Sequence, residues 1–248
     1  MEKKLVLCVP NFSEGRDKGK VDQIAGAIKN KKGVYLLDLE MDKDHNRTVL
    51  TILGGLNEVS EAVFEAVKTA TELIDLRTHQ GAHPRIGATD VVPFIPIQDT
   101  TMEDCSIAAR ELGKKIGNEL GIPVFLYEEA AIRPERKRLE EIRKGWLQSL
   151  SERIKDDPAW SPDFGPNMIH PTAGATVVGA RKPLIAFNVN LDTPDIKIAK
   201  KIAWRIRESC GGLPHVKAIG LLLEDNGIAQ ISMNLTDYES TPPDRVFH

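Results

Sequence analysis

The sequence has few cysteines, no long apolar run and no excess of positive charge. Its 248 residues include three cysteines, Cys8, Cys105 and Cys210, which lie far apart within apolar patterns. No disulfide framework or zinc spacing follows from them, which indicates reduced thiols in a reducing compartment. The apolar run near the N-terminus covers only residues 5–10, too short for a signal peptide or a membrane span. We therefore expect a cytoplasmic protein that has no membrane partner.

The charge is nearly balanced, with 33 basic and 36 acidic residues and a net charge of −3. This balance disfavours nucleic acid as a partner, because phosphate binding requires a clustered positive surface. The densest basic segment, residues 133–144, contains six Lys or Arg but also three Glu, which is typical of a solvated helix face. The glycine pairs at 54–55 and 211–212 match neither a phosphate loop nor a dinucleotide fingerprint. ATP, NAD and FAD are therefore not indicated.

Apolar residues make up 41% of the chain, and their periodicity predicts an α+β fold. In the first half we expect strands at 5–9, 34–39, 48–53 and 90–97, and helices at 18–29 and 57–74. This β-α-β-β-α-β order is that of the split βαβ, or ferredoxin-like, arrangement. A helix at 102–120 and a strand at 124–127 extend it. Residues 133–155 are interpreted as polar helix and linker, and residues 157–174 as a long loop, functional or linking.

A second unit with a related order is expected near residue 182. It consists of a strand at 184–191, a helix to about residue 208 with Thr193 as N-cap, and a hairpin of strands 216–223 and 228–234 turning at 225–227. We place the domains at 1–180 and 181–248. The second subdomain ends after its third strand, and its last residues follow Pro242-Pro243, so we expect no covering helix there. It is therefore interpreted as truncated, with further residues or a partner covering the exposed sheet.

The densest group of polar side chains lies in residues 77–87. His79 and His83 share this Gly- and Pro-rich segment with Arg77 and Arg85. Histidine can carry protons near neutral pH, and arginine binds carboxylates bidentately. The alternative is a loop whose histidines merely cap backbone groups. A zinc site on His79 and His83 would need a helix, which Gly81 and Pro84 disfavour, so no metal is expected.

Three other segments have a plain structural alternative. Residues 10–15 form either part of a site or a turn in which Ser13 caps the next helix. Asn46-Arg47 could be a surface turn. Residues 164–174 lie either over a cleft or between the two lobes as a linker.

Seven ordered motifs resemble the formiminotransferase family, known as the N-terminal part of formiminotransferase-cyclodeaminase and as a separate bacterial enzyme. The matching segments are 8–15 (CVPNFSEG), 46–49 (NRTV), 79–88 (HQGAHPRIGA), 90–96 (DVVPFIP), 163–166 (DFGP), 174–181 (GATVVGAR) and 185–190 (IAFNVN). The resemblance implies two ferredoxin-like subdomains with a substrate tunnel between them, and a homodimer. It also implies a transferase of histidine degradation that uses tetrahydrofolate as co-substrate and passes a formimino group to it from N-formimino-L-glutamate.

The resemblance carries over to particular residues. The histidine of its His-Pro-Arg motif is catalytic and falls on His83, the general acid and base of our expected mechanism. The folate-binding stretch falls on Gly165, Pro166, Asn167, Met168, Ile169, His170, Pro171, Thr172, Ala173 and Gly174. Mammalian relatives have an aromatic residue in place of Ala173, and the family's second subdomain is longer.

The remaining candidates follow from residue type and position. The donor's two carboxylates need cations, and we expect Arg85, Arg47 and Arg181, in falling order. Asn11 and Asn46 could orient amide or amidine groups. Three alternatives stay open: formyl handling, with N-formylglutamate or 5-formyltetrahydrofolate, a non-catalytic folate-binding subunit, and a metal hydrolase.

Overall fold

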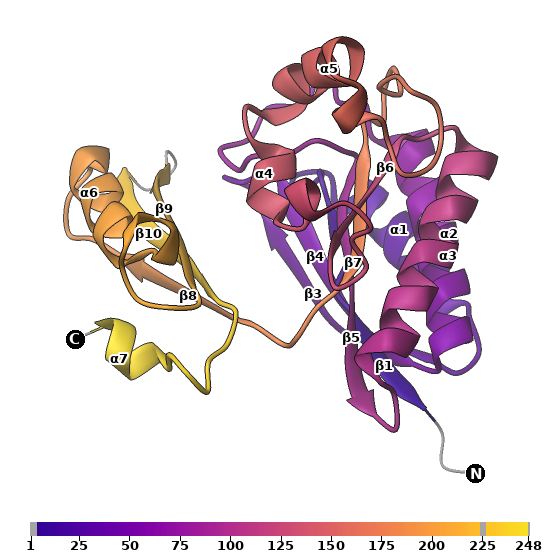
Figure 1. Cartoon of the computed structure of the whole chain (residues 1–248), viewed down its shortest axis with the longest axis horizontal. Helices are drawn as coiled ribbons and strands as arrows, with labels where there is room; N and C mark the ends of the chain where they lie inside the picture. Colours follow the sequence, from indigo (N-terminus) through magenta and orange to yellow (C-terminus); the bar gives the residue numbers. More distant parts are fainter. Residues whose placement is uncertain (1–3, 224–226, 248) are drawn as a thin grey trace. The chain divides into compact units, whose positions relative to one another are not determined.

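The computed structural model describes residues 4–223 and 227–247. They form two compact units, Met1–Arg181 and Lys182–His248. The chain is a mixed α+β protein with one sheet in each unit, as predicted (Figure 1).

The first unit contains a seven-stranded sheet. Its strands are β1 (Leu5–Cys8), β2 (Asn11–Phe12), β3 (Val34–Asp42), β4 (Arg47–Gly54), β5 (Thr89–Gln98), β6 (Val124–Glu128) and β7 (Thr176–Ala180). Short β1 and β2 follow one another between β4 and β5, antiparallel to both, and β3 pairs antiparallel with β4. These pairings are those of the predicted ferredoxin-like arrangement.

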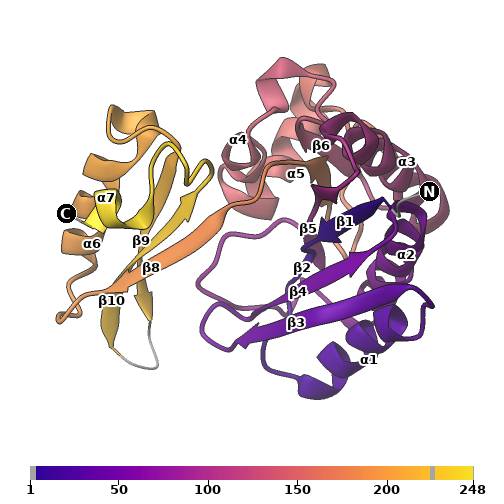
Figure 2. The ribbon, with the colours of Figure 1, turned by 90° about the horizontal axis from the view of Figure 1, so that it is seen from below.

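Helices cover both faces of this sheet. Helices α1 (Lys18–Lys29), α2 (Leu56–Leu73) and α3 (Met102–Leu120) lie together on one face (Figures 1 and 2). Apolar residues of these helices and of the strands form the largest core cluster. Helices α4 (Leu139–Arg143) and α5 (Trp146–Asp156) cover the other face beside β6 and β7, where Ile142 and Leu150 pack with Phe125 and Val177.

Local signals account for the ends of the long helices. Helix α3 begins with a capping box of Thr101 and Asp104 and ends at Gly121, whose φ is 64°. Helix α1 is capped by Asp17, which accepts from the Gly19 and Lys20 amides. The alternative in which Ser13 caps this helix was wrong, because the Ser13 hydroxyl donates to the Gly87 carbonyl instead, at 2.7 Å.

Two parts of the first unit differ from the prediction. Strand β7 lies within residues for which the sequence pattern predicted no strand, parallel between β5 and β6. The segment predicted as one polar helix and linker is divided into a short 3-10 turn, Pro134–Arg136, and helices α4 and α5. Gly145 and Trp146, with φ of 73° and 62°, separate the two helices.

The second unit has a three-stranded antiparallel sheet in the order β8–β10–β9. Its elements are β8 (Ile185–Asn190), α6 (Ile196–Ile206), η3 (Glu208–Cys210), β9 (Val216–Leu223), β10 (Ile228–Leu235) and α7 (Pro243–Phe247). Helix α6 packs closely on the sheet. A Cβ atom added to Gly220 on β9 would lie only 2.4 Å from the backbone nitrogen of Lys200 on α6.

Two predictions for this unit were wrong. The N-cap of α6 is Asp195, whose carboxylate accepts from the Lys197 amide, and not Thr193. The last residues do form a short helix, α7, and Val246 packs against the core of the unit. Two residues of the predicted hairpin turn, Asp225 and Asn226, fall outside the described residues.

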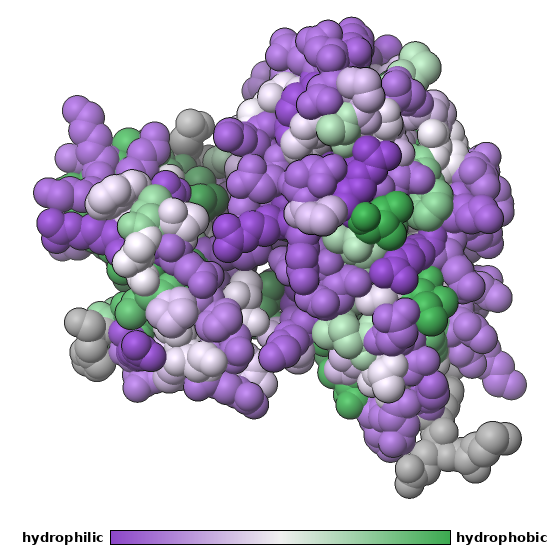
Figure 3. Space-filling model, in the orientation of Figure 1, coloured by the Kyte–Doolittle hydropathy of each residue, from purple (hydrophilic) through white to green (hydrophobic). Residues whose placement is uncertain are grey.

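Most of the surface in view in Figure 3 is hydrophilic, with small scattered apolar areas. Within residues 4–223 and 227–247, no helix combines the length and the apolar character needed to cross a membrane.

Candidate active site

His83 lies in the loop between α2 and β5 and is half-buried. Its Nδ1 atom is 2.7 Å from the Pro84 carbonyl oxygen, which accepts a hydrogen bond when Nδ1 carries the proton. Nε2 then has the free lone pair. Burial and the guanidiniums of Arg47 and Arg143 hold the pKa of His83 well below its ordinary value. The ring is therefore a neutral base at pH 7.

Arg47 and Asn11 lie on neighbouring strands. The Arg47 guanidinium donates to the Asn11 side-chain oxygen, and the Asn11 amide donates to the Val9 carbonyl at 2.8 Å. Burial, and then Arg143, lower the pKa of Arg47 to about 10, so it stays charged at neutral pH. Its Nε is buried and has no hydrogen-bond partner among the described residues. An anionic ligand would satisfy this donor.

Asn46 connects three parts of the loop region. Its side-chain oxygen accepts a hydrogen bond from the Gly15 backbone amide at 2.9 Å, and its side-chain nitrogen donates one to the Gln80 carbonyl at 2.8 Å. Its own carbonyl is 3.0 Å from Nε2 of His79. Both polar atoms of the Asn46 side chain therefore form hydrogen bonds within the protein, and these bonds hold the segments around Gly15 and Gln80 together.

Arg143 and Asp90 form an ion pair that the sequence interpretation missed. Asp90 is 2% exposed and also accepts from the Ile86 amide at 2.8 Å. Arg143 was assigned to a solvated helix face because charges of both signs surround it in the sequence. The only sequence signal was the position of Asp90 at the start of the 90–96 motif, directly after the histidine loop.

Arg85 is held against two neighbours. It donates to the His79 carbonyl at 2.6 Å, and its guanidinium carbon is 5.7 Å from the centre of the Trp146 ring. Its Nη1 is buried without a hydrogen-bond partner in the described part of the chain. Burial lowers the pKa of Arg85. The pKa of His79 is also lowered, first by burial and then by the positive charge of Arg85. Arg85 therefore also has a donor for a carboxylate.

The loop at 165–174 is joined to the histidine loop near its C-terminal end. The Ala88 amide donates to the Ala173 carbonyl, and the Ala175 amide to the Ile86 carbonyl, both at 2.8 Å. Gly174 has a φ of 73°, and a Cβ there would lie 2.3 Å from the Ile86 oxygen, so glycine is required.

The side chains of this loop differ in exposure. Pro166, Asn167 and Met168 are exposed, whereas Ala173 is 1% exposed. A ring cannot stack on Ala173 while that residue is buried. His170 is half-buried, and its Nδ1 accepts from the Ala173 amide at 3.0 Å.

Arg181 is placed differently from the other arginines. Its amide donates to the Phe94 carbonyl, and its side chain hydrogen-bonds Tyr127. Phe94 is three residues from Val91, the partner of Asn11 on β5, or about 10 Å along the strand at the usual rise. The structure thus brings Asn11, Arg47 and His83 together and places the Arg181 backbone farther along the sheet.

The arrangement suits proton transfer on an anionic substrate. A neutral imidazole can accept a proton, and the arginines around it can bind carboxylates. In the part of the chain that the structure describes, no three His, Cys, Asp or Glu side chains are grouped to hold a metal ion.

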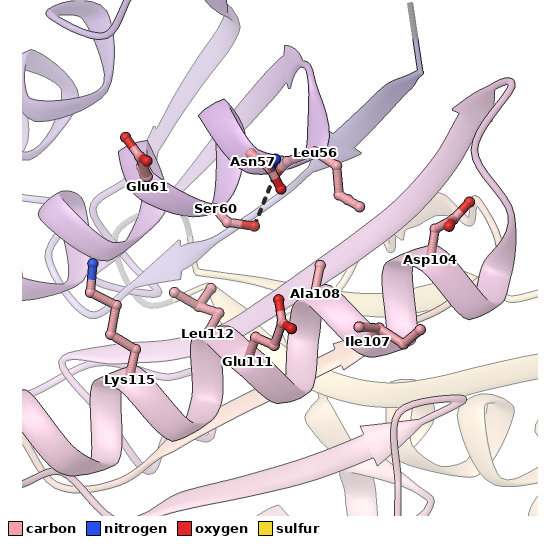
Figure 4. Close-up of a pocket in the computed structure, with 10 residues that line it drawn as sticks. All are labelled: Leu56, Asn57, Ser60, Glu61, Asp104, Ile107, Ala108, Glu111, Leu112 and Lys115. Carbon is pink, nitrogen blue, oxygen red and sulfur yellow. Dashed lines mark hydrogen bonds between the residues drawn. The ribbon is translucent and has the colours of Figure 1, made fainter.

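A separate groove lies between α2 and α3, with a volume of about 440 Å³ (Figure 4). Glu61, Asp104, Glu111 and Lys115 are among its lining residues. None of the predicted site residues lines it, so the groove is not part of the candidate site.

Comparison with known proteins agrees with the motifs. The model of the formiminotransferase domain, N-terminal subdomain, matches residues 5–181, and that of the formiminotransferase domain matches residues 186–248. Glutamate formimidoyltransferase of Streptococcus pyogenes serotype M1 is 50% identical over 244 residues, covering 98% of this chain and 81% of the relative. The protein of the same name from Thermoplasma acidophilum is 51% identical, covering 98% and 80%. Formimidoyltransferase-cyclodeaminase of Rattus norvegicus is 45% identical, covering 96% of this chain and 45% of that protein. The chain therefore belongs to the formiminotransferase family.

Proposed function

We propose that this chain is a transferase that moves a formimino group from N-formimino-L-glutamate to tetrahydrofolate, giving 5-formiminotetrahydrofolate and L-glutamate. Two relatives named glutamate formimidoyltransferase, about 50% identical over nearly the whole chain, support this reaction. The observation in the molecule that carries the proposal is a neutral His83 beside arginines with unsatisfied donors.

The reaction requires one net proton movement. N5 of tetrahydrofolate attacks the formimino carbon and loses its proton, and the glutamate nitrogen gains a proton as its bond to that carbon breaks. Nε2 of His83 is suited to the first transfer, because the Pro84 carbonyl holds the proton on Nδ1. The low pKa of the ring also makes its protonated form a ready acid for the second transfer.

Substrate binding is assigned to the groups around His83. Arg85 and Arg47 bind the donor carboxylates, since each has a buried nitrogen without a hydrogen-bond partner among the described residues. Arg181 is a third candidate. Residues 165–174 contact the folate, and the exposed segment around Asn167 and Met168 offers the accessible surface.

The test is transfer from N-formimino-L-glutamate to tetrahydrofolate, followed spectrophotometrically, with N-formyl-L-glutamate as the competing donor. We expect formimino transfer to have the higher kcat/KM. Higher kcat/KM with the formyl donor would replace the proposed substrate, and folate binding without turnover of either donor would indicate a non-catalytic subunit.

We also propose that the protein acts in the cytoplasm as a homodimer, as the family resemblance implies. Sedimentation equilibrium of the full chain tests the dimer. A single species with the monomer mass would contradict it.

A further inference from the structure

His45 lies two residues before the first residue of β4 and is 8% exposed. Its Nδ1 is 2.6 Å from one Asp42 oxygen, and its backbone amide donates to the other at 2.8 Å. The carboxylate thus holds both the ring and the backbone of His45. Because a carboxylate accepts only, Nδ1 carries a proton, so the ring gains or loses its second proton at Nε2.

Nε2 of His45 is buried and has no hydrogen-bond partner within the described residues. Leaving a buried polar nitrogen unpaired is unfavourable, so such an atom in a site indicates a group that is satisfied when a ligand binds. The ring is edge-on to His83, with 5.8 Å between ring centres and an interplanar angle of 83°. One water or one small substrate group can connect two rings at this separation.

We propose that His45, oriented by Asp42, is a second proton-transfer residue of this site. The inference rests on the proposed function and assigns its second proton transfer to His45 in place of His83. His83 removes the proton from N5 as the new carbon–nitrogen bond forms, and protonated His45 delivers one to the glutamate nitrogen as the old bond breaks. The proton on His83 then returns to His45 directly or through one water, so the net change is one proton moved from N5 to the amine.

The charged groups around the two rings favour His45 as the acid and His83 as the base. Asp42 on β3 faces His45 and balances the charge of a protonated ring, as carboxylates do for other catalytic histidines. Arg47 on β4 and Arg143 on α4 act on His83 and disfavour its protonated form. Two imidazoles with opposite electrostatic surroundings are the arrangement expected for an acid and a base in one site.

The experiment compares His45→Gln, His45→Ala and Asp42→Asn with the wild type. We expect kcat to fall about 100-fold in both His45 variants, the usual effect of losing a general acid or base, with KM for both substrates within about threefold of wild type. Asp42→Asn should lower kcat by about tenfold or more, because the ring loses its charge-balancing partner. His215→Gln, in the second unit, is the matched control and should keep wild-type kinetics.

Two readouts separate proton transfer from a structural contribution. Added imidazole should restore part of the activity of His45→Ala, where the ring leaves a space, and little in His45→Gln, where a side chain fills it. The pH dependence of kcat should also lose one limb in both variants. A kcat of His45→Gln within about threefold of wild type, or unchanged pH dependence without imidazole rescue, would overturn the proposal.

Failure of the proposed function has a different signature. It would appear as no formimino transfer by the wild-type protein. In that case the ring nitrogens are followed by NMR in the wild type and in His83→Gln. Loss of His83 should alter the titration of His45 if the rings exchange a proton, and an unaltered titration would overturn the pairing.

Discussion

Replacing Asp163 by Asn is expected to destabilise the first unit strongly. The side chains of Asp163 and Arg136 are 1% and 0% exposed, and their charged atoms are 2.5 Å apart. The other Asp163 oxygen accepts from the Leu126 amide at 2.7 Å, and Arg136 donates to the Ser161 carbonyl at 2.6 Å. Asparagine keeps the shape but leaves the Arg136 charge buried without compensation. Breaking such a pair costs about 3–5 kcal/mol.

Urea unfolding followed by tryptophan fluorescence measures this loss. In a Trp204→Phe background the remaining indoles, Trp146 and Trp160, both report on the first unit. With an m-value of about 2 kcal/mol/M, the midpoint should fall by about 1.5–2.5 M. Asp156→Asn, at an exposed carboxylate, is the control and should change stability by less than about 0.5 kcal/mol.

The double variant Arg136→Met with Asp163→Asn removes both charges. It should recover more than half of the loss, because the uncompensated charge and not the missing carboxylate causes most of it. A loss below about 1 kcal/mol for Asp163→Asn alone would refute the reasoning.

Five further predictions concern residues of the site. His83→Ala should lower kcat about 100-fold or more with little change in folate affinity, and near-normal turnover would contradict the assignment. Because burial and neighbouring arginines depress the pKa of His83, the decline of kcat/KM on the acidic side should begin below the ordinary value of about 6.5. The lowered pKa of His83 in the folded state also makes the free energy of unfolding depend on pH. The stability is complete above about 6.5, the ordinary pKa of histidine, and is lost as pH falls toward the pKa of the folded state. The unfolding midpoint measured against pH tests this. Arg85→Lys should raise KM for the donor, since it loses the planar fork; a change in folate affinity alone would reassign it. Hydrogen exchange should slow at residues 165–174 when folate binds, and protection found only elsewhere would make this segment a linker.

Much of the fold followed from local signals. Helices α1 and α3 have the predicted bounds because an apolar stripe of helical period and capping residues such as Thr101 specify them within a few residues. The N-cap of α6 was assigned two residues early, since Thr193 and Asp195 are both competent caps and packing decides between them. Strand β7 was missed because its parallel partners, β5 and β6, are distant in sequence.

The motif at 79–88 is enough to indicate the histidine loop, whereas the charged neighbours of that loop are distant in sequence. Arg143 and Asp90 are 53 residues apart, and no local pattern connects them. His45 and Asp42 are near in sequence, but their significance depends on the buried Nε2 and on the His83 ring beside it.

The sequence by itself determined most of the secondary structure of the first unit, the α+β class and the position of the histidine loop, because periodicity, caps and turn residues act over a few neighbouring positions. Only the tertiary structure decided which charges surround His83 and which donors are left unsatisfied. Both depend on burial and on contacts between distant segments, which set local electrostatics and cannot be obtained from residue order alone.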